Sequence, residues 1–189
     1  MKKSVISTLI GAVFAATSFA SLADDASGPS FDYVNLSYTE VELGYESDTY
    51  SGYRAQFVKS FNDVLFVRTG HERFGRGEFN TEEFEFSLGA RHALDNNASL
   101  YAGVGFVNAH QSEARSYLGY NVFSGVAIRA SQDLELHAEL NRVHTYSETE
   151  VRSEFGARYY LSPRLSVNGS YGFSNKDREQ MRVGVSFHF

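Results

Sequence analysis

Apolar and polar residues alternate along most of the chain. In the segment 82–91, Phe84 and Phe86 alternate with Glu83 and Glu85. The same period of two recurs in several later segments, at 134–141, 151–160, 165–174 and 181–189. A period of two places successive side chains on opposite faces of a β-strand, so these segments predict strands with one apolar and one polar face. No segment of this region has a convincing helical period.

Turn-forming residues divide the pattern into ten predicted strands. Asn, Asp, Ser and Pro form tight turns at 62–63, 95–97, 131–133 and 162–164, and more polar connections lie between these turns. The predicted strands are 31–43, 52–61, 64–74, 80–92, 98–110, 116–130, 133–144, 149–161, 164–174 and 179–189. Each is long enough for a tilted membrane span, and an even number of strands is typical of transmembrane barrels. We therefore predict an all-β fold, a closed antiparallel up-and-down transmembrane β-barrel of ten strands, with eight strands as the alternative.

The first predicted strand has an irregular pattern. Val34 and Tyr38 favour one outward face, whereas Val41 and Leu43 favour the opposite face. A β-bulge adds one residue to a strand and so exchanges its two faces beyond that point. We therefore expect a bulge near Thr39.

Aromatic residues gather near both ends of the predicted strands. The group at the tight-turn end contains Phe31, Phe61, Tyr159, Phe187 and Phe189. The group near the more polar connections contains Tyr50, Tyr53, Phe74, Phe79, Tyr117 and Phe173. Two such groups predict the aromatic girdles that mark the membrane interfaces of a barrel. The alternative is that aromatic residues simply favour strands.

The amino-terminal residues have the plan of a secretory signal peptide. Lys2 and Lys3 precede an apolar stretch at 5–20, which is short for a membrane anchor. Small residues suit cleavage after Ala23, with cleavage after Ala20 as the less favoured alternative. We expect three parts: a cleaved signal peptide at 1–23, a short segment at 24–30 and the barrel at 31–189.

Composition excludes several classes of function. The chain has no cysteine, which excludes disulfides and thiol chemistry, and its mean hydropathy is −0.31, with no second candidate for a spanning helix. Loss of residues 1–23 would remove Lys2 and Lys3, leaving 15 of the 17 basic residues against 23 acidic ones, a net charge of −8. This acidic balance argues against nucleic acid as a partner. The remaining length fits one domain.

The polar faces of the strands define what the barrel would enclose. They bring together seven arginines and six glutamates: Arg54, Arg68, Arg91, Arg129, Arg152, Arg158 and Arg182 with Glu72, Glu83, Glu85, Glu135, Glu139 and Glu154. Arg129 lies opposite Glu135 across a turn, and His137 shares that face between Glu135 and Glu139. Charges that leave bulk water need such pairing. Because ten strands enclose only slightly more space than the eight that side chains can fill, we expect a plugged lumen, with a narrow charge-lined pore as the alternative.

The segment 181–189 alternates up to a terminal aromatic residue and resembles the closing strand of bacterial outer-membrane barrels. In that resemblance Phe187 and Phe189 are the assembly signal. With the signal peptide, the hairpins and the charged lumen, the chain after residue 23 is similar to the small OmpA and OmpX type barrels. This implies location in a Gram-negative outer membrane, contact with its lipid and lipopolysaccharide, and delivery by periplasmic chaperones to the barrel-assembly machinery. The chain departs from that group in its ten predicted strands and short loops.

The sequence gives little indication of a catalytic or metal-binding site. An omptin-type protease needs paired aspartates at the extracellular rim, but the candidates lie in tight turns at the other end: Asp63, Asp95 and Asp133. Three histidines approach the extracellular rim without ligand spacing on one strand: His71, His110 and His144. We expect no catalytic residue, no metal and no cofactor.

A lipid A deacylase needs a serine, a histidine and an acid on the outer face. His110 and Ser112 share that face, and Glu82 lies on the preceding strand, so a triad is geometrically possible. Glu113 departs from the His-x-Ser-Asn motif of that family. We therefore predict a barrel without enzymatic activity and with a structural or surface-interaction role. A narrow porin-like solute channel is the alternative, and a lipid A-modifying hydrolase comes third.

Overall fold

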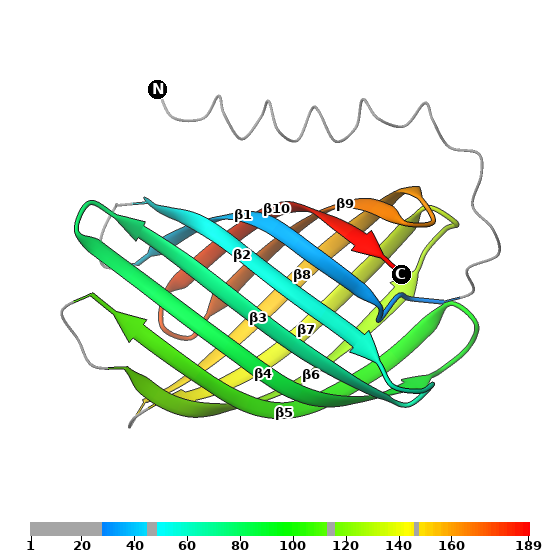
Figure 1. Ribbon diagram of the computed structural model, residues 1–189, viewed down its shortest axis with the longest axis horizontal. Coiled ribbons are helices and arrows are strands. Elements are labelled where there is room, and N and C mark those ends of the chain that lie inside the picture. Colours follow the sequence, from blue (N-terminus) through cyan, green and yellow to red (C-terminus); the bar gives the residue numbers. More distant parts are fainter. Residues whose placement is uncertain (1–27, 45–48, 113–115, 146–147) are drawn as a thin grey trace.

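The computed structural model describes residues 28–189 except 45–48, 113–115 and 146–147. Its antiparallel strands form a closed barrel in which β1 pairs with both β2 and β10 (Figure 1). The strands are β1 (Tyr33–Leu43), β2 (Thr49–Ser60), β3 (Leu65–Arg76), β4 (Phe79–Ala93), β5 (Ala98–Gln111), β6 (Tyr117–Arg129), β7 (Leu134–Thr145), β8 (Glu148–Ser162), β9 (Leu165–Ser174) and β10 (Arg178–His188). The predicted ten-stranded all-β barrel is confirmed. The predicted signal peptide lies outside the described residues.

Among the described residues, no helix is long and apolar enough to cross a membrane. β1 begins and β10 ends at the same end of the barrel, which we call the terminal end, at the right of Figure 1. The connections at the opposite end span 44–48, 77–78, 112–116, 146–147 and 175–177. They are shorter than their polar composition predicts, because the strands extend into several of these segments.

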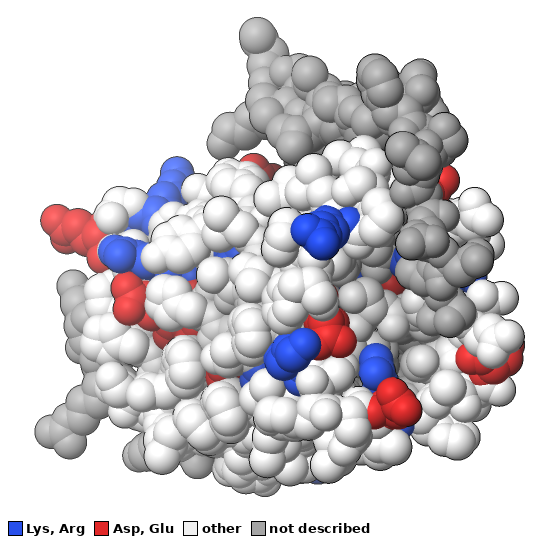
Figure 2. Space-filling model, turned by 45° about the vertical axis from the view of Figure 1, so that its right-hand side comes forward, with Lys and Arg blue, Asp and Glu red and all other residues white. Residues whose placement is uncertain are grey.

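Side chains alternate between the lumen and the outer face along each strand. In β4, Glu83 and Glu85 are buried inside, whereas Phe84 and Phe86 are exposed outside. In Figure 2, charged residues gather at the left edge of the view and again from its middle to its right, and uncharged surface lies between the two groups. An apolar outer band of this kind suits the hydrocarbon core of a bilayer.

The last strand closes the barrel as the sequence predicts. Tyr33 of β1 pairs with His188 of β10, and Val34 pairs with Phe187. Phe187 and Phe189 are exposed on the outer face, while His188 is buried inside. The predicted faces of the terminal segment are therefore confirmed.

The predicted bulge in β1 is wrong. Residue pairs continue without a shift along both neighbours of β1, and Thr39 points into the lumen. Val41 points inward as well and is fully buried with Tyr50 and Phe74. The apolar positions of β1 shift from the outer to the inner face because the lumen is apolar at this level. The strand therefore continues regularly, without a bulge.

Among the described residues, three predicted girdle residues are buried inside the barrel: Phe31, Tyr50 and Phe74. The terminal cluster, as we call it, contains Phe31, Val58, Phe66 and Phe123, packed against Tyr33 and Tyr101. The opposite cluster contains Val41, Tyr50 and Phe74, packed against Leu43. Other predicted girdle members are exposed outside: Phe61, Phe187 and Phe189 at the terminal end, with Tyr53 and Phe173 at the other. Phe79 shares the inward parity of Glu83, and its ring centroid lies 5.3 Å from that of Tyr50. Tyr117 shares the inward face of Phe123 on β6. Strand parity separates the two groups, since only outward residues reach lipid.

Phe123 tests the terminal cluster. Its side chain is 1% exposed and contacts Phe66, Tyr101 and the guanidinium of Arg68, which lies 3.7 Å from the ring centroid. We expect Phe123→Ala to lower the free energy of unfolding by about 3–5 kcal/mol, because it leaves a cavity among packed rings. Urea unfolding in phospholipid vesicles measures the change. Phe155→Ala is the control, since that ring is 55% exposed on the outer face; an equal loss there would contradict the prediction.

Candidate functional site

A network of ion pairs fills the lumen between the terminal and opposite clusters. The predicted residues that take part are Arg54, Arg68, Arg129, Arg152, Arg158 and Arg182 with Glu72, Glu83, Glu85, Glu135, Glu139, Glu154 and His137. They come from seven of the strands and meet because strand alternation turns all of them inward. We call this set the luminal network.

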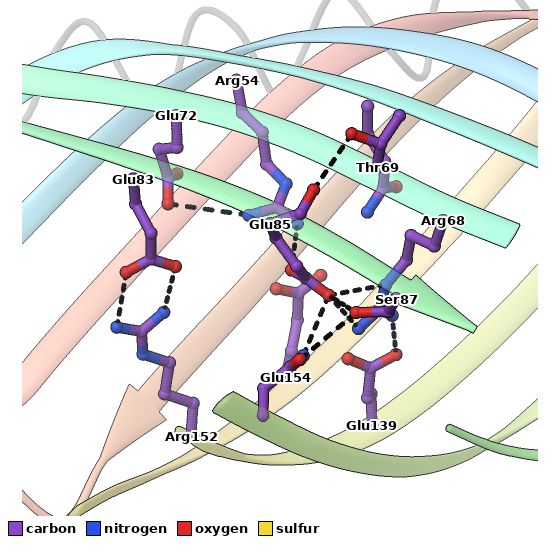
Figure 3. Close-up of polar contacts among 12 residues, drawn as sticks. Arg54, Arg68, Thr69, Glu72, Glu83, Glu85, Ser87, Glu139, Arg152 and Glu154 are labelled. Atoms are coloured by element: carbon purple, nitrogen blue, oxygen red, sulfur yellow. Dashed lines mark hydrogen bonds and ion pairs between the residues drawn. The ribbon is translucent and has the colours of Figure 1, made fainter. Parts of the chain in front are cut away.

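Glu72 of β3 joins several strands through one carboxylate. It is 1% exposed, and its Oε1 accepts hydrogen bonds from Thr39 of β1 at 3.2 Å and from Gln180 of β10 at 2.6 Å. Arg182 of β10 donates to the same oxygen at 3.1 Å, and Arg54 of β2 lies 3.7 Å from Oε2 (Figure 3). Glu72 therefore connects the strands on both sides of the closing seam.

Glu85 of β4 holds a second set of donors. Arg68 donates to its Oε1 from Nε at 3.1 Å and from Nη2 at 2.8 Å. Ser87 and Asn121 donate to the same oxygen at 2.9 and 3.0 Å. Arg54 lies 3.6 Å from Oε2, so its guanidinium connects the carboxylates of β3 and β4. Hydrogen bonds to a charged acceptor are stronger than neutral ones, which suits a carboxylate shielded from bulk water.

Two ion pairs cross the lumen. Arg68 of β3 reaches Glu139 of β7 at 2.7 Å. Arg152 of β8 forms a two-point contact with Glu83 of β4, with N–O distances of 2.7 and 2.9 Å (Figure 3). Because neither pair joins adjacent strands, their side chains occupy the cross-section of the barrel.

The row nearest the terminal end contains the predicted pair of Arg129 and Glu135. These residues are direct cross-strand partners, and Nη1 of Arg129 lies 3.5 Å from Oε2 of Glu135. Arg158 of β8 donates to the other oxygen at 2.7 Å, and the Tyr160 hydroxyl donates to Oε2 at 2.9 Å. One buried carboxylate thus serves two buried arginines.

His137 belongs to the luminal network, and its partner lies on the neighbouring strand. The sequence places it between Glu135 and Glu139, but its Nε2 lies 3.6 Å from Oε1 of Glu154 on β8. Arg182 contacts the same carboxylate. The direct cross-strand partner of His137 is Gly156, and the imidazole lies over this glycine because it has no side chain. This position brings the imidazole to Glu154, the diagonal neighbour on β8.

Arg91 lies at the terminal mouth, outside the luminal network. Its Nε donates to the backbone carbonyl of Asp63 at 3.0 Å, and its guanidinium lies 4.9 Å from the ring centroid of Phe31. Arg91 points inward as predicted, but at this level its side chain makes a cation–π contact and a backbone hydrogen bond instead of an ion pair.

Sequence reasoning missed two charged members of the lumen, Glu150 and Arg178. Glu150 contacts Arg152 at 2.8 Å. Arg178 lies 3.6 Å from Glu72, with its guanidinium 4.9 Å from the ring centroid of Phe74. Strand parity could have identified both residues. Arg178 was not predicted as a luminal residue because its polar neighbours placed it in a connection rather than in a strand.

Two small cavities remain in the lumen, with volumes of about 120 and 50 Å³. The larger lies toward the terminal end, and the smaller toward the opposite end. Both are bounded by four members of the luminal network: Arg54, Glu139, Glu154 and Arg182. Each cavity can hold water, since about 10–15 Å³ of this measure admits one molecule.

The candidate hydrolase residues do not form a triad. Ser112 is engaged with Asn80, donating to its carbonyl oxygen at 3.0 Å and accepting from its backbone N–H at 2.6 Å. Nδ1 of His110 contacts the hydroxyl of Ser116 at 3.2 Å instead. Glu82 is the direct cross-strand partner of His110. The serine hydroxyl is therefore committed to the backbone rather than to a base. No group of three His, Asp or Glu side chains within the described ranges could hold a metal ion.

Comparisons with known proteins agree with this architecture. NanC porin has a similar fold, with a TM-score of 0.54 and 8% identity over 82% of this chain and 100% of its own. KdgM porin, in a complex with disordered oligogalacturonate, gives a TM-score of 0.50 and 14% identity over 82% of this chain and 99% of its own. No curated protein sequence matches the chain. The family described as outer membrane protein beta-barrel domain matches residues 6–189, so the chain belongs to this family of barrels in the Gram-negative outer membrane.

Proposed function

We propose that this protein is a non-catalytic outer-membrane barrel with a plugged lumen and a structural or surface-interaction role in the envelope. The observation that carries the proposal is the occupation of the lumen by crossing ion pairs, Arg68 with Glu139 and Arg152 with Glu83. The remaining cavities, about 120 and 50 Å³, have room for water and not for a continuous solute path.

The plug resists opening for an electrostatic reason. A path through the lumen requires charged groups to separate where bulk water is scarce, and loss of one partner from a buried pair costs about 3–5 kcal/mol. Glu72 and Glu85 each contact more than one arginine, so a rotation of one side chain leaves the other contacts in place.

A narrow solute channel is the second candidate. NanC and KdgM, two solved barrels of similar fold, are porins. In this protein the two cavities are neighbours and share several lining residues. A concerted rearrangement of Arg182 and Glu154 would join the cavities. The charged side chains around the joined path would then set its selectivity.

In the proposed arrangement the terminal end of the barrel faces the periplasm, because an exported chain reaches the outer membrane from that side and its closing strand ends there. Lipid and lipopolysaccharide contact the apolar outer band. Residues 1–23 act as the export signal, and periplasmic chaperones and the assembly machinery receive the chain, with Phe187 and Phe189 as the signal for assembly.

Conductance in planar bilayers tests the plug. We expect the barrel refolded without residues 1–23 to show no steady unitary openings, because ion pairs span its lumen. Joint replacement of Arg152 and Glu83 by alanine should produce openings, since the two-point contact that crosses the lumen is lost. Steady openings of the unaltered barrel would favour the channel instead.

Glu72 tests the contribution of the luminal network to stability. We expect Glu72→Ala to lower the free energy of unfolding by about 3–5 kcal/mol, because buried arginines lose their counterion. Glu82→Ala is the control: Glu82 pairs with Arg73 at 3.4 Å on the outer face, where both are exposed. Its loss should change the stability by less than about 1 kcal/mol. Similar changes for both variants in urea unfolding would show that burial of the pair does not matter.

A further inference from the structure

The residues just before β1 cross the terminal mouth of the barrel. We call residues 28–32 the strap. Ser30 and Phe31 form part of the wall of the larger cavity, on its terminal side. At its far side the strap reaches the turn between β4 and β5, where a side chain at Gly28 would meet the carbonyl oxygen of Asn96 at 3.2 Å.

Phe31 anchors the strap in the terminal cluster. Its side chain is 7% exposed, and its ring centroid lies 5.1 Å from that of Phe66 and 5.6 Å from that of Tyr101. The guanidinium of Arg91 lies 4.9 Å from the centroid of the same ring. Because the strap reaches this position without belonging to the hydrogen-bond ladder of a strand, side-chain contacts hold it in place.

Ser30 makes two polar contacts with the barrel, and the backbone carbonyl of Phe31 accepts a hydrogen bond from the Ser60 hydroxyl at 3.4 Å. The backbone N–H of Ser30 donates to Oε2 of Glu135 at 3.1 Å, and the Ser30 hydroxyl lies 3.0 Å from Nδ1 of His188. Nε2 of His188 contacts Ser166 at 2.8 Å, which fixes the imidazole against the barrel wall.

Asp32 is the fixed point from which the strap extends. Its carboxylate lies 2.7 Å from Nζ of Lys59 and accepts the Ser60 N–H at 3.1 Å. Burial alone would raise the pKa of Asp32, but the hydrogen bonds from Lys59 and Ser60 lower it below the usual value. The backbone carbonyl of Asp32 also accepts the Phe189 N–H at 3.3 Å. Release of the strap would therefore begin at Ser30 and Phe31 and stop at Asp32.

The strap competes with arginine for the carboxylate of Glu135. Oε2 already accepts from the Tyr160 hydroxyl and from the Ser30 N–H. Arg129 lies 3.5 Å from the same oxygen, and its Nε and Nη1 have no hydrogen-bond partner among the described residues. Within the same part of the chain, Nε of Arg158 has none either. A buried donor without a partner is costly. While the strap is bound, these N–H groups of Arg129 and Arg158 therefore lack a hydrogen-bond acceptor.

The mouth beneath the strap is positively charged. Arg129 and Arg158 share the carboxylate of Glu135. Arg91 adds a third positive charge at the mouth, where it contacts the ring of Phe31. Asp32 and Lys59 neutralise each other at the edge. The carboxylates at the tips of the turns are mostly exposed to water, which screens them.

We propose that the strap is a releasable plug, and that its release exposes a cationic vestibule that takes small oxyanions from the periplasmic side. This rests on the proposed plugged lumen. A carboxylate, phosphate or sulfonate would supply the acceptors that Arg129 and Arg158 lack. The chemistry is reversible binding, so no covalent step is involved.

A thiol placed in the larger cavity tests the proposal. The chain contains no cysteine, so Ser170→Cys, in the wall of that cavity, gives a unique thiol. Its rate of labelling by a methanethiosulfonate with a sulfonate group is compared with the rate for one with a trimethylammonium group. We expect slow labelling with the intact strap. Phe31→Ala should raise the sulfonate rate by roughly tenfold or more, because the anchor of the strap is lost.

Three further variants complete the test. Ser30→Pro removes the N–H that binds Glu135 but keeps Phe31, so it gives an independent release if Phe31→Ala folds poorly. Phe155→Ala, on the outer face, should leave the rate unchanged. Ser174→Cys, in the wall of the smaller cavity, should label at a rate that the strap variants do not alter.

The outcomes separate this inference from the proposed function. An unchanged Ser170→Cys rate in both strap variants would overturn the releasable strap and leave the plugged lumen standing. Equal acceleration for the anionic and cationic reagents would overturn the cationic vestibule. Labelling at the rate of a free thiol while the strap is intact would overturn the plugged lumen itself.

Discussion

A carboxylate inside a closed barrel loses bulk water and has to recover that solvation from neighbouring side chains. Glu72 recovers it from Thr39, Arg182 and Gln180, which belong to the first and last strands. The contacts that solvate the charge therefore also hold the seam at which the barrel closes. Glu85 and Glu135 likewise collect several donors each on other strands. Glu83, Glu139 and Glu154 complete the luminal network with contacts to Arg152, Arg68 and Arg182.

Division of the lumen into zones follows from the same constraint. Charges gather in the middle, where each can reach several partners, and apolar rings close both ends. Phe31 and Phe123 belong to the terminal cluster, while Val41 and Phe74 belong to the opposite one. The zones differ in how they are held: strands carry the opposite cluster, whereas Phe31 comes from the strap. This difference makes the terminal end the mobile closure in our proposal.

Much of the fold follows from local pattern. A period of two and polar turns were enough to predict the ten strands, their inward arginines and glutamates, and the outward Phe187 and Phe189. The pattern misled where apolar residues line the lumen. The pattern predicted that β1 changes face before Val41 and that Tyr50 belongs to a girdle. Both predictions assume that apolar side chains point outward, whereas these two residues lie in an apolar zone inside the lumen.

The sequence by itself determined the strands, the two faces of each strand and the membrane in which they reside, because these depend on neighbours along the chain. It also placed Arg129 opposite Glu135, since one turn sets their register. Only the tertiary structure decided that Arg68 meets Glu139, that His137 turns to Glu154 and that the strap fills the mouth. Such contacts depend on closure of the barrel, which brings distant strands face to face across a lumen narrow enough for side chains to span.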